Sequence, residues 1–355
     1  MKKYLFLFFL SSIFCRVATA RNHVEASSPS DTLAARVAVL EARTSTWDKI
    51  VSRLPEFSGY VQAGYQYGGE ASSFFLKRVR LSIAGDIVPK LDYKIQFEFC
   101  KPQLVDAYLQ YSPFRQLKLK VGQYKIPFSI ENTDYPPTRF ELIEYPLALC
   151  KLVGFGSDLC GISASGRELG ATLSGGFFPR QGRNVVGYDF SVFNGEGINT
   201  WDKNKSKDVV ARLSLRPVDG LLLSGSYYWG EYGASYFKRE RYGAGICYDR
   251  GAVVVRGEWI GGRTGSDHGE FGSDGWYLLA GWRAPYNLMP VVRFDTFAEN
   301  TAARSATRQD NYTVGLLWAP VKHLRCQINY TYENYGPAFD TAARSVVAVM
   351  FTGMF

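Results

Sequence analysis

Basic side chains alternate with apolar residues in two short runs, from Arg78 to Leu81 and from Leu117 to Val121. Because side chains two residues apart point to the same side of an extended strand, each run places two cations on one face. Neither run contains an acid, and such a face attracts anions. Ion pairs with acids elsewhere, such as Glu131 or Glu141, are the alternative role. With the base that follows the second run, the candidate residues are Arg78, Arg80, Lys118, Lys120 and Lys125.

Histidine and cysteine give little support to a catalytic or metal site. The chain has three His and six Cys, without a CxxC motif or a His and Cys cluster of the kind that binds zinc. His268 is expected in a loop and His323 in a turn at the opposite end of the fold, which disfavours a nucleophile activated by histidine. We therefore expect no enzyme activity, cofactor or metal.

Two cysteines share the longest expected connection, which runs from Lys125 to about Arg167. Cys150 and Cys160 lie ten residues apart in the sequence, and a disulfide between them would stiffen this segment. Cys100, expected in a loop at the same rim, could pair with either of them. The sequence leaves these pairings open, and Cys150 with Cys160 is the one we predict.

The elements that position these residues are strands. From Leu91 to Phe99 every odd-numbered residue is apolar and every even-numbered one is charged or carries an amide, which is typical of a strand with one apolar and one wet face. About sixteen such runs follow one another from Phe57 to Phe355, each near the length that a tilted membrane strand needs. The high aromatic content of 15% agrees with β structure and with interfacial aromatic residues.

Connections between these strands alternate between short and long. Tight turns follow Ile83, Tyr111, Leu215, Tyr248 and Trp318. The longer connections are expected near residues 125–167, 194–208, 230–240, 261–274, 298–311 and 334–343. Short turns at one rim and long loops at the other are typical of a transmembrane β-barrel, whose closed sheet leaves no unpaired edge in the bilayer. The fold class is therefore an all-β, antiparallel transmembrane barrel of about sixteen strands, with a polar lumen.

The N-terminal region differs from the barrel. Lys2 and Lys3 precede an apolar stretch that ends in Ala18-Thr19-Ala20, which indicates an export signal over residues 1–20. A leader over residues 21–55 follows, with a short amphipathic helix expected over residues 31–43. This helix is either a frayed leader or a small assembly helix. The barrel is expected over residues 56–355.

The last strand ends in an aromatic residue. Counting back from Phe355, every second position is apolar or glycine as far as Val347. A terminal Phe on such a strand resembles the assembly signal of bacterial outer-membrane barrels. The barrel-assembly machinery is therefore an expected partner, together with outer-membrane lipid.

An ordered set of segments resembles the phosphate-selective porin O and P family. The resemblance is carried by Arg78 to Leu81, Val121 to Ser129, Phe193 to Gly195, Gly275 to Tyr277, Pro290 to Asp295 and Asn329-Tyr330. It implies a sixteen-stranded trimeric channel in the bacterial outer membrane, often with a short helical leader, and with the third loop folded inward as a constriction.

The expected function is a water-filled channel for passive diffusion of small hydrophilic solutes or ions. Its partners would be small solutes or anions and two further copies of the chain, and no nucleic acid. The charge of the third loop departs from the family's anion-selective members: from Lys125 to Cys160 it has three bases (Lys125, Arg139, Lys151) and five acids (Glu131, Asp134, Glu141, Glu144, Asp158). A preference for anions such as phosphate is thus an open question. A structural or adhesive barrel with a blocked lumen is the alternative.

Overall fold

The protein is described by a computed structural model that covers residues 36–37, 54–68, 72–156, 158–162 and 165–355. The chain divides into two compact units, Met1–Leu54 and Pro55–Phe355, and the fold below is that of the second. The predicted export signal lies outside the described residues, as does most of the predicted leader. Of the expected helix over residues 31–43, only Arg36 and Val37 are described, and both are helical.

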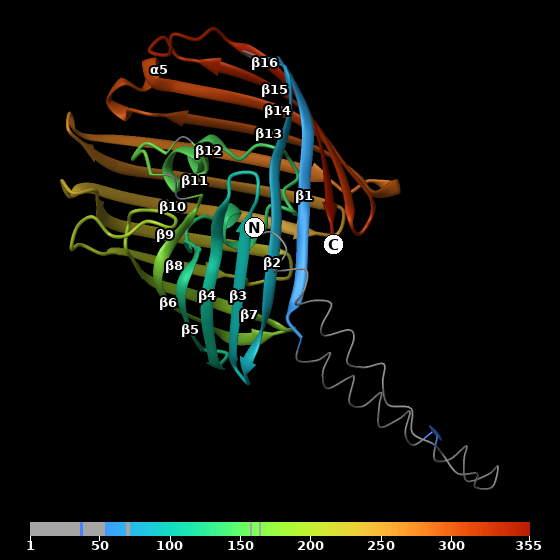
Figure 1. Ribbon diagram of the computed structural model, residues 1–355. Helices are drawn as coiled ribbons and strands as arrows, with labels where there is room; N and C mark the ends of the chain where they lie inside the picture. The colour runs from blue at the N-terminus through green and yellow to red at the C-terminus, as the bar shows by residue number, and fades with distance from the viewer. Residues whose placement is uncertain (1–35, 38–53, 69–71, 157, 163–164) are drawn as a thin grey trace, which may run out of the picture. The chain divides into compact units, whose positions relative to one another are not determined.

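Within the described part of the chain, sixteen antiparallel strands form one closed barrel (Figure 1). Their bounds are β1 Glu56–Gly68, β2 Ser73–Val88, β3 Leu91–Glu98, β4 Gln103–Phe114, β5 Leu117–Lys125, β6 Arg167–Arg180, β7 Arg183–Phe193, β8 Asp208–Leu215, β9 Leu221–Tyr232, β10 Phe237–Arg250, β11 Val253–Ser266, β12 Gly269–Trp282, β13 Leu288–Ala298, β14 Arg308–Val321, β15 Leu324–Tyr335 and β16 Arg344–Met354. The predicted barrel is confirmed, and several strands are longer than expected.

The first and last strands close the sheet. β1 pairs with β16 from Tyr60 opposite Met354 to Gly68 opposite Val346. Beyond this ladder, the Gly59 N–H donates to the Phe355 carbonyl over 2.9 Å, and the Phe355 N–H donates to the Gly59 carbonyl over 3.0 Å. Each strand therefore has a partner on both sides, which is the condition for crossing hydrocarbon with strands.

Side chains alternate between the two faces of the wall. In β8, Val210, Arg212 and Ser214 are buried inside the barrel, whereas Leu213 and Leu215 are exposed on its outer surface. The outward Trp side chains of the strands lie on β9, β11, β12 and β14. The apolar face thus meets lipid and the other face lines the lumen.

The two rims differ as predicted, except at two of the predicted long connections. Tight turns join β2 to β3, β6 to β7, β10 to β11 and β14 to β15, whereas connections 126–166, 194–207, 299–307 and 336–343 lie at the other rim. The connection predicted over residues 230–240 is reduced to residues 233–236 between β9 and β10. The long loop predicted over residues 261–274 is absent. Ser266 pairs with Gly269 in a tight hairpin, and backbone pairing continues through this glycine-rich segment even though its side chains do not alternate.

A bulge in β2 changes which side chains face the lumen. Gln62 of β1 pairs with Arg78 and the next residue, Ala63, pairs with Leu76, so Lys77 is an extra residue in β2. An extra residue shifts the alternation by one position. Phe75 consequently packs inside the barrel against Ile143 of the third loop, which the even-numbered pattern of Arg78 and Arg80 would not predict.

The described helices are short. They are α3 (Ile130–Asp134), α4 (Leu147–Val153), α5 (Arg304–Thr307) and the single 3₁₀ turns η1 (Pro285–Asn287) and η2 (Thr301–Ala303). None of the helices in the described residues is long and apolar enough to cross a membrane.

The aromatic ring of the last residue, Phe355, allows the predicted assembly signal to be tested. Its side chain is 68% exposed, so truncating it removes little packing and leaves the backbone bonds to Gly59 possible. We expect Phe355→Ala to fold in detergent but to accumulate several-fold less in the outer membrane, measured as the heat-modifiable folded band in membrane fractions. Phe351→Ala, which truncates an outward ring within the same strand, is the matched control. Equal accumulation of the two variants would contradict the signal.

Candidate functional site

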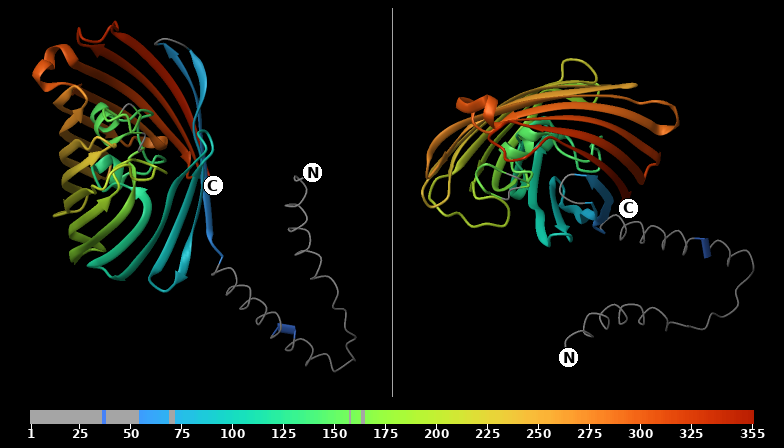
Figure 2. Two further views of the ribbon diagram at one scale, coloured as in Figure 1. Left: turned by 60° about the vertical axis from the view of Figure 1, so that its left-hand side comes forward. Right: turned by 90° about the horizontal axis from the view of Figure 1, so that it is seen from above.

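The connection between β5 and β6, residues 126–166, folds into the lumen (Figure 2, green). Its apolar side chains Phe128, Leu149 and Leu152 pack with wall residues that include Val210 and Ile260, and all five are buried. Removing such side chains from water stabilises the inward position of the loop. This placement agrees with the inward third loop that the family resemblance implied.

Arg256 of β11 is the central polar contact between wall and loop. Its side chain is completely buried, and its guanidinium donates to Glu131 over 2.9 Å and to Glu141 over 2.6 Å. The ring of Tyr135 covers the same guanidinium, with the ring centroid 4.0 Å from the central carbon. One wall cation thus fixes three loop residues at once.

More than one carboxylate lies around the single guanidinium of Arg256, so negative charge is locally in excess. Burial raises the pKa of the Glu131 carboxyl; Arg256 opposes this, and the neighbouring carboxylates of Glu141 and Glu258 add to it. One oxygen of Glu131 has no hydrogen-bond partner among the described residues. The loop therefore depends on Arg256, because without it two buried carboxylates would lose their counter-charge.

Glu258, two residues further along β11, holds the N-terminus of α3. Its carboxylate accepts hydrogen bonds from the Ser129 hydroxyl over 3.0 Å, from the Ile130 N–H over 2.6 Å and from the Glu131 N–H over 3.1 Å. A fourth bond comes from the Tyr277 hydroxyl over 2.7 Å. A carboxylate is favoured here because the first N–H groups of a helix are otherwise unpaired.

The second loop helix is held in the same way. The Asp295 carboxylate accepts from the N–H of Leu147, the first residue of α4, over 3.0 Å, and pairs with Arg293 over 2.8 Å. Arg293 also donates to the carbonyl of Glu144 over 2.6 Å. Arg293 and Asp295, which lie two residues apart on one face of the strand, thus pair with each other and also bind the loop.

Further wall bases bind the loop on other sides of the lumen. Arg212 and Arg216 of β8 and the following turn both pair with Asp134, the latter over 3.0 Å. Arg325 of β15 donates to the carbonyls of Thr138 and Phe140. Most inward arginines of the wall therefore anchor the loop rather than face open water.

The five predicted basic residues do not form one free cluster. Arg80 pairs with Glu98 of β3 over 2.8 Å, because the register places the two opposite each other. Arg78 donates to the Gln62 side chain over 2.9 Å and to the Tyr145 hydroxyl over 2.8 Å.

The three lysines have different surroundings. Lys125 donates to the carbonyls of Asn132 and Tyr135 over 2.7 Å and 2.8 Å, so it also holds the loop. Lys120 lies over the ring of Tyr108, 4.5 Å from its centroid. Lys118 is exposed and lines a cavity of about 330 Å³ with Arg115, Arg183, Arg212 and Arg216 and with one acid, Asp189, which lies 3.8 Å from Arg212. It is thus the predicted residue whose charge is available to a solute.

The predicted disulfide is not formed in this structure, because Cys150 and Cys160 are both free thiols. Cys150 lies in α4, where burial raises the pKa of its thiol to about 12. The Cys160 sulfur accepts a hydrogen bond from Arg241 over 3.2 Å. The two sulfurs thus have separate environments, and spacing along the loop could not reveal this.

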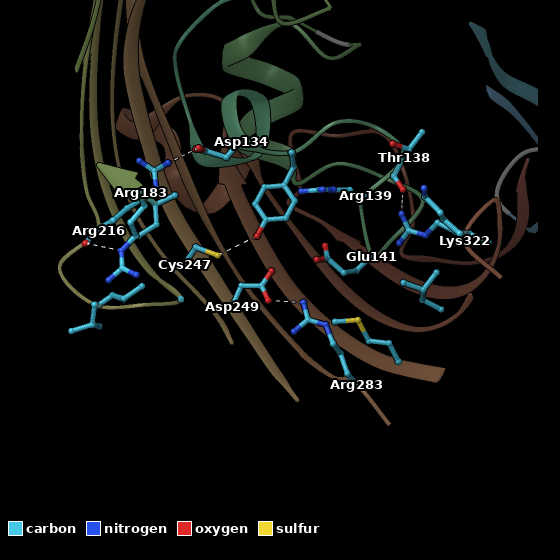
Figure 3. Close-up of a pocket in the computed structure, with 18 of the residues that line it drawn as sticks. Asp134, Thr138, Arg139, Glu141, Arg183, Arg216, Cys247, Asp249, Arg283 and Lys322 are labelled. Carbon is cyan, nitrogen blue, oxygen red and sulfur yellow. Dashed lines mark hydrogen bonds and ion pairs between the residues drawn. The ribbon is translucent and has the colours of Figure 1, made fainter. Parts of the chain in front are cut away.

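A cavity of about 690 Å³ lies between the loop and the tight-turn rim (Figure 3). Six bases line it (Arg139, Arg183, Arg216, Arg283, Lys322 and Arg325) together with three acids (Asp134, Glu141 and Asp249). Asp249 pairs with Arg283 over 2.5 Å, and Asp134 pairs with Arg216. The acids are therefore engaged, whereas the basic lining is in excess.

Two of these bases are not engaged. Among the described residues, no hydrogen bond or ion pair involves the side chain of Arg139 or Lys322, and both side chains are exposed. Sequence reasoning counted Arg139 only as part of the loop's charge, and it did not single out Lys322. Neither the loop nor the turn has a repeating pattern that would have placed the two at one cavity.

No three His, Cys, Asp or Glu side chains of the described segments gather in a way that could hold a metal ion.

The comparisons with known proteins agree with this geometry. The sequence matches the family described as phosphate-selective porin O and P over residues 49–346, which is more than half of the chain. The chain belongs to this family. It is an outer-membrane channel protein, located in the bacterial outer membrane, and the family is one of channels rather than enzymes. No protein of curated function gave a match.

Solved structures show the same fold at low identity. An anion-selective porin from Comamonas acidovorans has a TM-score of 0.65 and 13% identity, with 85% of this chain and 99% of that chain covered. The outer membrane protein OmpT of Vibrio cholerae, in its trimer form, has a TM-score of 0.60 and 9% identity over 85% and 99% of the two chains. The channel DcaP of Acinetobacter baumannii has a TM-score of 0.58 and 10% identity over 85% and 97%.

Removing the cation at the centre of the loop contacts should release the porin's third loop. In Arg256→Gln, Glu131 and Glu141 would remain buried without a counter-charge, which costs about 3–5 kcal/mol. We expect faster hydrogen exchange of backbone amides across residues 126–166, measured by mass spectrometry on the folded protein. Arg304→Gln, which breaks the pair between the exposed Arg304 and Asp274 away from the third loop, is the control and should leave this exchange unchanged. Unchanged exchange in Arg256→Gln would show that the remaining polar and apolar contacts hold the loop without this cation.

Proposed function

We propose that this porin prefers anions among the small solutes that diffuse through it. The observation that carries the proposal is the cavity of about 690 Å³, where Arg139 and Lys322 have no acid to neutralise them. Lys118 adds a further exposed cation in the adjoining cavity. Unpaired positive charge in a water-filled lumen raises the local concentration of anions and lowers that of cations.

The acidic excess of the third loop does not argue against this preference. Glu131 and Glu141 pair with Arg256, and Asp134 pairs with Arg212 and Arg216. Glu144 pairs with Lys77. Acids held in this way contribute little field to the lumen, so the selectivity of the channel would depend on the bases that are left over.

The position of the cavity suggests where selection takes place. Its lining comes from the turns after β8 and β12 and from the turn at Lys322, all at the tight-turn rim. In outer-membrane barrels the short turns face the periplasm. We infer that anions are collected in a vestibule on the periplasmic side of the constriction.

We also propose features of this protein that concern its export and assembly. An export signal over residues 1–20, a leader over residues 21–55, a homotrimer, and contact with outer-membrane lipid and the barrel-assembly machinery fit an outer-membrane porin. The trimer form of OmpT, a barrel of the same fold, supports the homotrimer. The leader helix would then be an assembly element outside the barrel.

Ion selectivity can be measured directly. We expect the purified protein in planar bilayers to conduct, with a reversal potential in asymmetric KCl that indicates a preference for chloride. Lys118→Glu and Lys322→Glu should each shift the permeability ratio toward potassium by about two- to fivefold, as expected for a reversed charge near the permeating ion at moderate salt.

The control reverses a lysine outside the lumen cavities. Lys207 pairs with Asp202 in the connection between β7 and β8, and Lys207→Glu should leave the ratio unchanged. A reversal potential that none of the variants moves would contradict the proposed role of these lysines. Purified protein that never conducts would favour a barrel with a blocked lumen.

A further inference from the structure

The periplasmic-side cavity has an apolar wall that a simple anion channel does not need. Leu222 of β9, Met289 of β13 and Leu317 of β14 line it from inward positions, which in strands such as β8 also carry polar side chains like Arg212 and Ser214. Other inward apolar residues of the wall, such as Val254 and Leu279, do not line this cavity. Met289 and Leu317 lie directly opposite each other in neighbouring strands. The three side chains interrupt the alternation of polar and apolar faces.

The sequence shows the same interruption as runs that are apolar on both faces. These runs are Leu221-Leu222-Leu223, Leu288-Met289-Pro290 and Leu316-Leu317-Trp318. Lipid accounts for the outward members, such as Leu223 and Trp318, which are exposed on the outer surface. It does not account for the inward ones.

Contact with the third loop accounts for part of these inward residues. Leu222 packs against Ile130, and Met289 and Leu317 belong to a cluster with Leu142. Leu222, Met289 and Leu317 also border the open cavity, although they are only 9%, 7% and 6% exposed. The exposed Val218, with Leu221 and Met354, extends the apolar surface that they present. The cavity therefore has an apolar wall and basic groups around the same space.

The bases stand where they could hold an anionic head group. Arg139 comes from the loop and Lys322 from the turn after β14, so the two approach the cavity from different elements (Figure 3). A volume of about 690 Å³ exceeds what a single small inorganic ion requires and is in the usual range for sites of organic ligands.

We propose that this cavity is a binding site for amphipathic organic anions, namely carboxylates with an aliphatic or aromatic body of several carbons. The carboxylate binds to Arg139 and Lys322, and the hydrocarbon body lies on Leu222, Met289 and Leu317. The proposal rests on the anion preference above and names the solute class for which the vestibule is built.

The lining distinguishes this class from inorganic oxyanions. A hydrated phosphate would gain binding free energy only from its contacts with the bases. It would lose part of its hydration if it approached the apolar wall. A carboxylate with a hydrocarbon tail gains from both surfaces, because each buried methylene contributes to binding. Affinity should therefore increase with tail length, although every member of such a series carries the same charge.

The test measures block of KCl current through the purified full-length protein in planar bilayers. Acetate, butyrate, hexanoate and octanoate are added to both compartments in turn, with inorganic phosphate as a separate probe. We expect the concentration for half block to fall by about two- to fourfold for each methylene along the carboxylate series. Half-block concentrations that are equal from acetate to octanoate would overturn the proposal.

Paired variants locate the effect. Met289→Gln keeps side-chain length but removes the apolar surface, so it should flatten the dependence on tail length and leave block by acetate within about twofold of wild type. Met350→Gln is the matched control, because Met350 is an inward, buried methionine of β16 that does not line the cavity. Heat-modifiable migration in gels verifies that both variants are folded. An equal dependence on tail length in Met289→Gln and wild type would place the site elsewhere and overturn the assignment.

The outcomes separate this inference from the proposed function. A channel that prefers chloride but shows no dependence on tail length keeps the anion preference and loses the amphipathic site. A channel without preference for chloride contradicts the proposed function, and the inference that rests on it then fails as well.

Discussion

In hydrocarbon every N–H and C=O of a strand needs a partner, and the rest of this structure depends on that requirement. The pairing of β1 with β16 supplies the last set of partners and closes the sheet. A closed sheet of this size is hollow, and its inner face must be compatible with water. The inner face therefore provides the polar side chains on which the third loop and the cavities are built.

The inner wall and the loop neutralise each other. Arg256 joins Glu131 and Glu141, while Glu258 and Asp295 accept from the N–H groups that begin α3 and α4. A polar wall thus serves as the framework for a loop whose apolar side chains would otherwise face water. The electrostatic character of the lumen is then determined by the few bases that this arrangement leaves without partners.

The sequence predicted the barrel well, because alternation and turn length are local properties. Residues 91–99 alone identify a strand with a lipid face and a water face. The tight turns indicate which strand ends lie at the rim with short connections. Contacts between distant strands and the loop could not be predicted. The run from Arg78 to Leu81 contains no acid, yet the register places Glu98 of the neighbouring strand beside Arg80. The same limit applies to Cys150 and Cys160, since the path of the loop inside the barrel separates their environments.

The extra residue in β2 indicates how such a wall tolerates changes in length. Lys77 is accommodated as a bulge, and its ammonium group reaches Glu144 of the loop. Deleting Lys77 would remove the bulge and leave Phe74 outward and Phe75 inward as they are now. Deleting a single residue from a regular part of the strand would instead exchange the water and lipid faces of the residues beyond it. Whether a side chain of this barrel points to lipid or to water therefore depends on the number of residues that precede it in the strand. Insertions and deletions are expected to accumulate in the connections at the long-loop rim, whereas within a strand they persist only where a bulge restores the alternation.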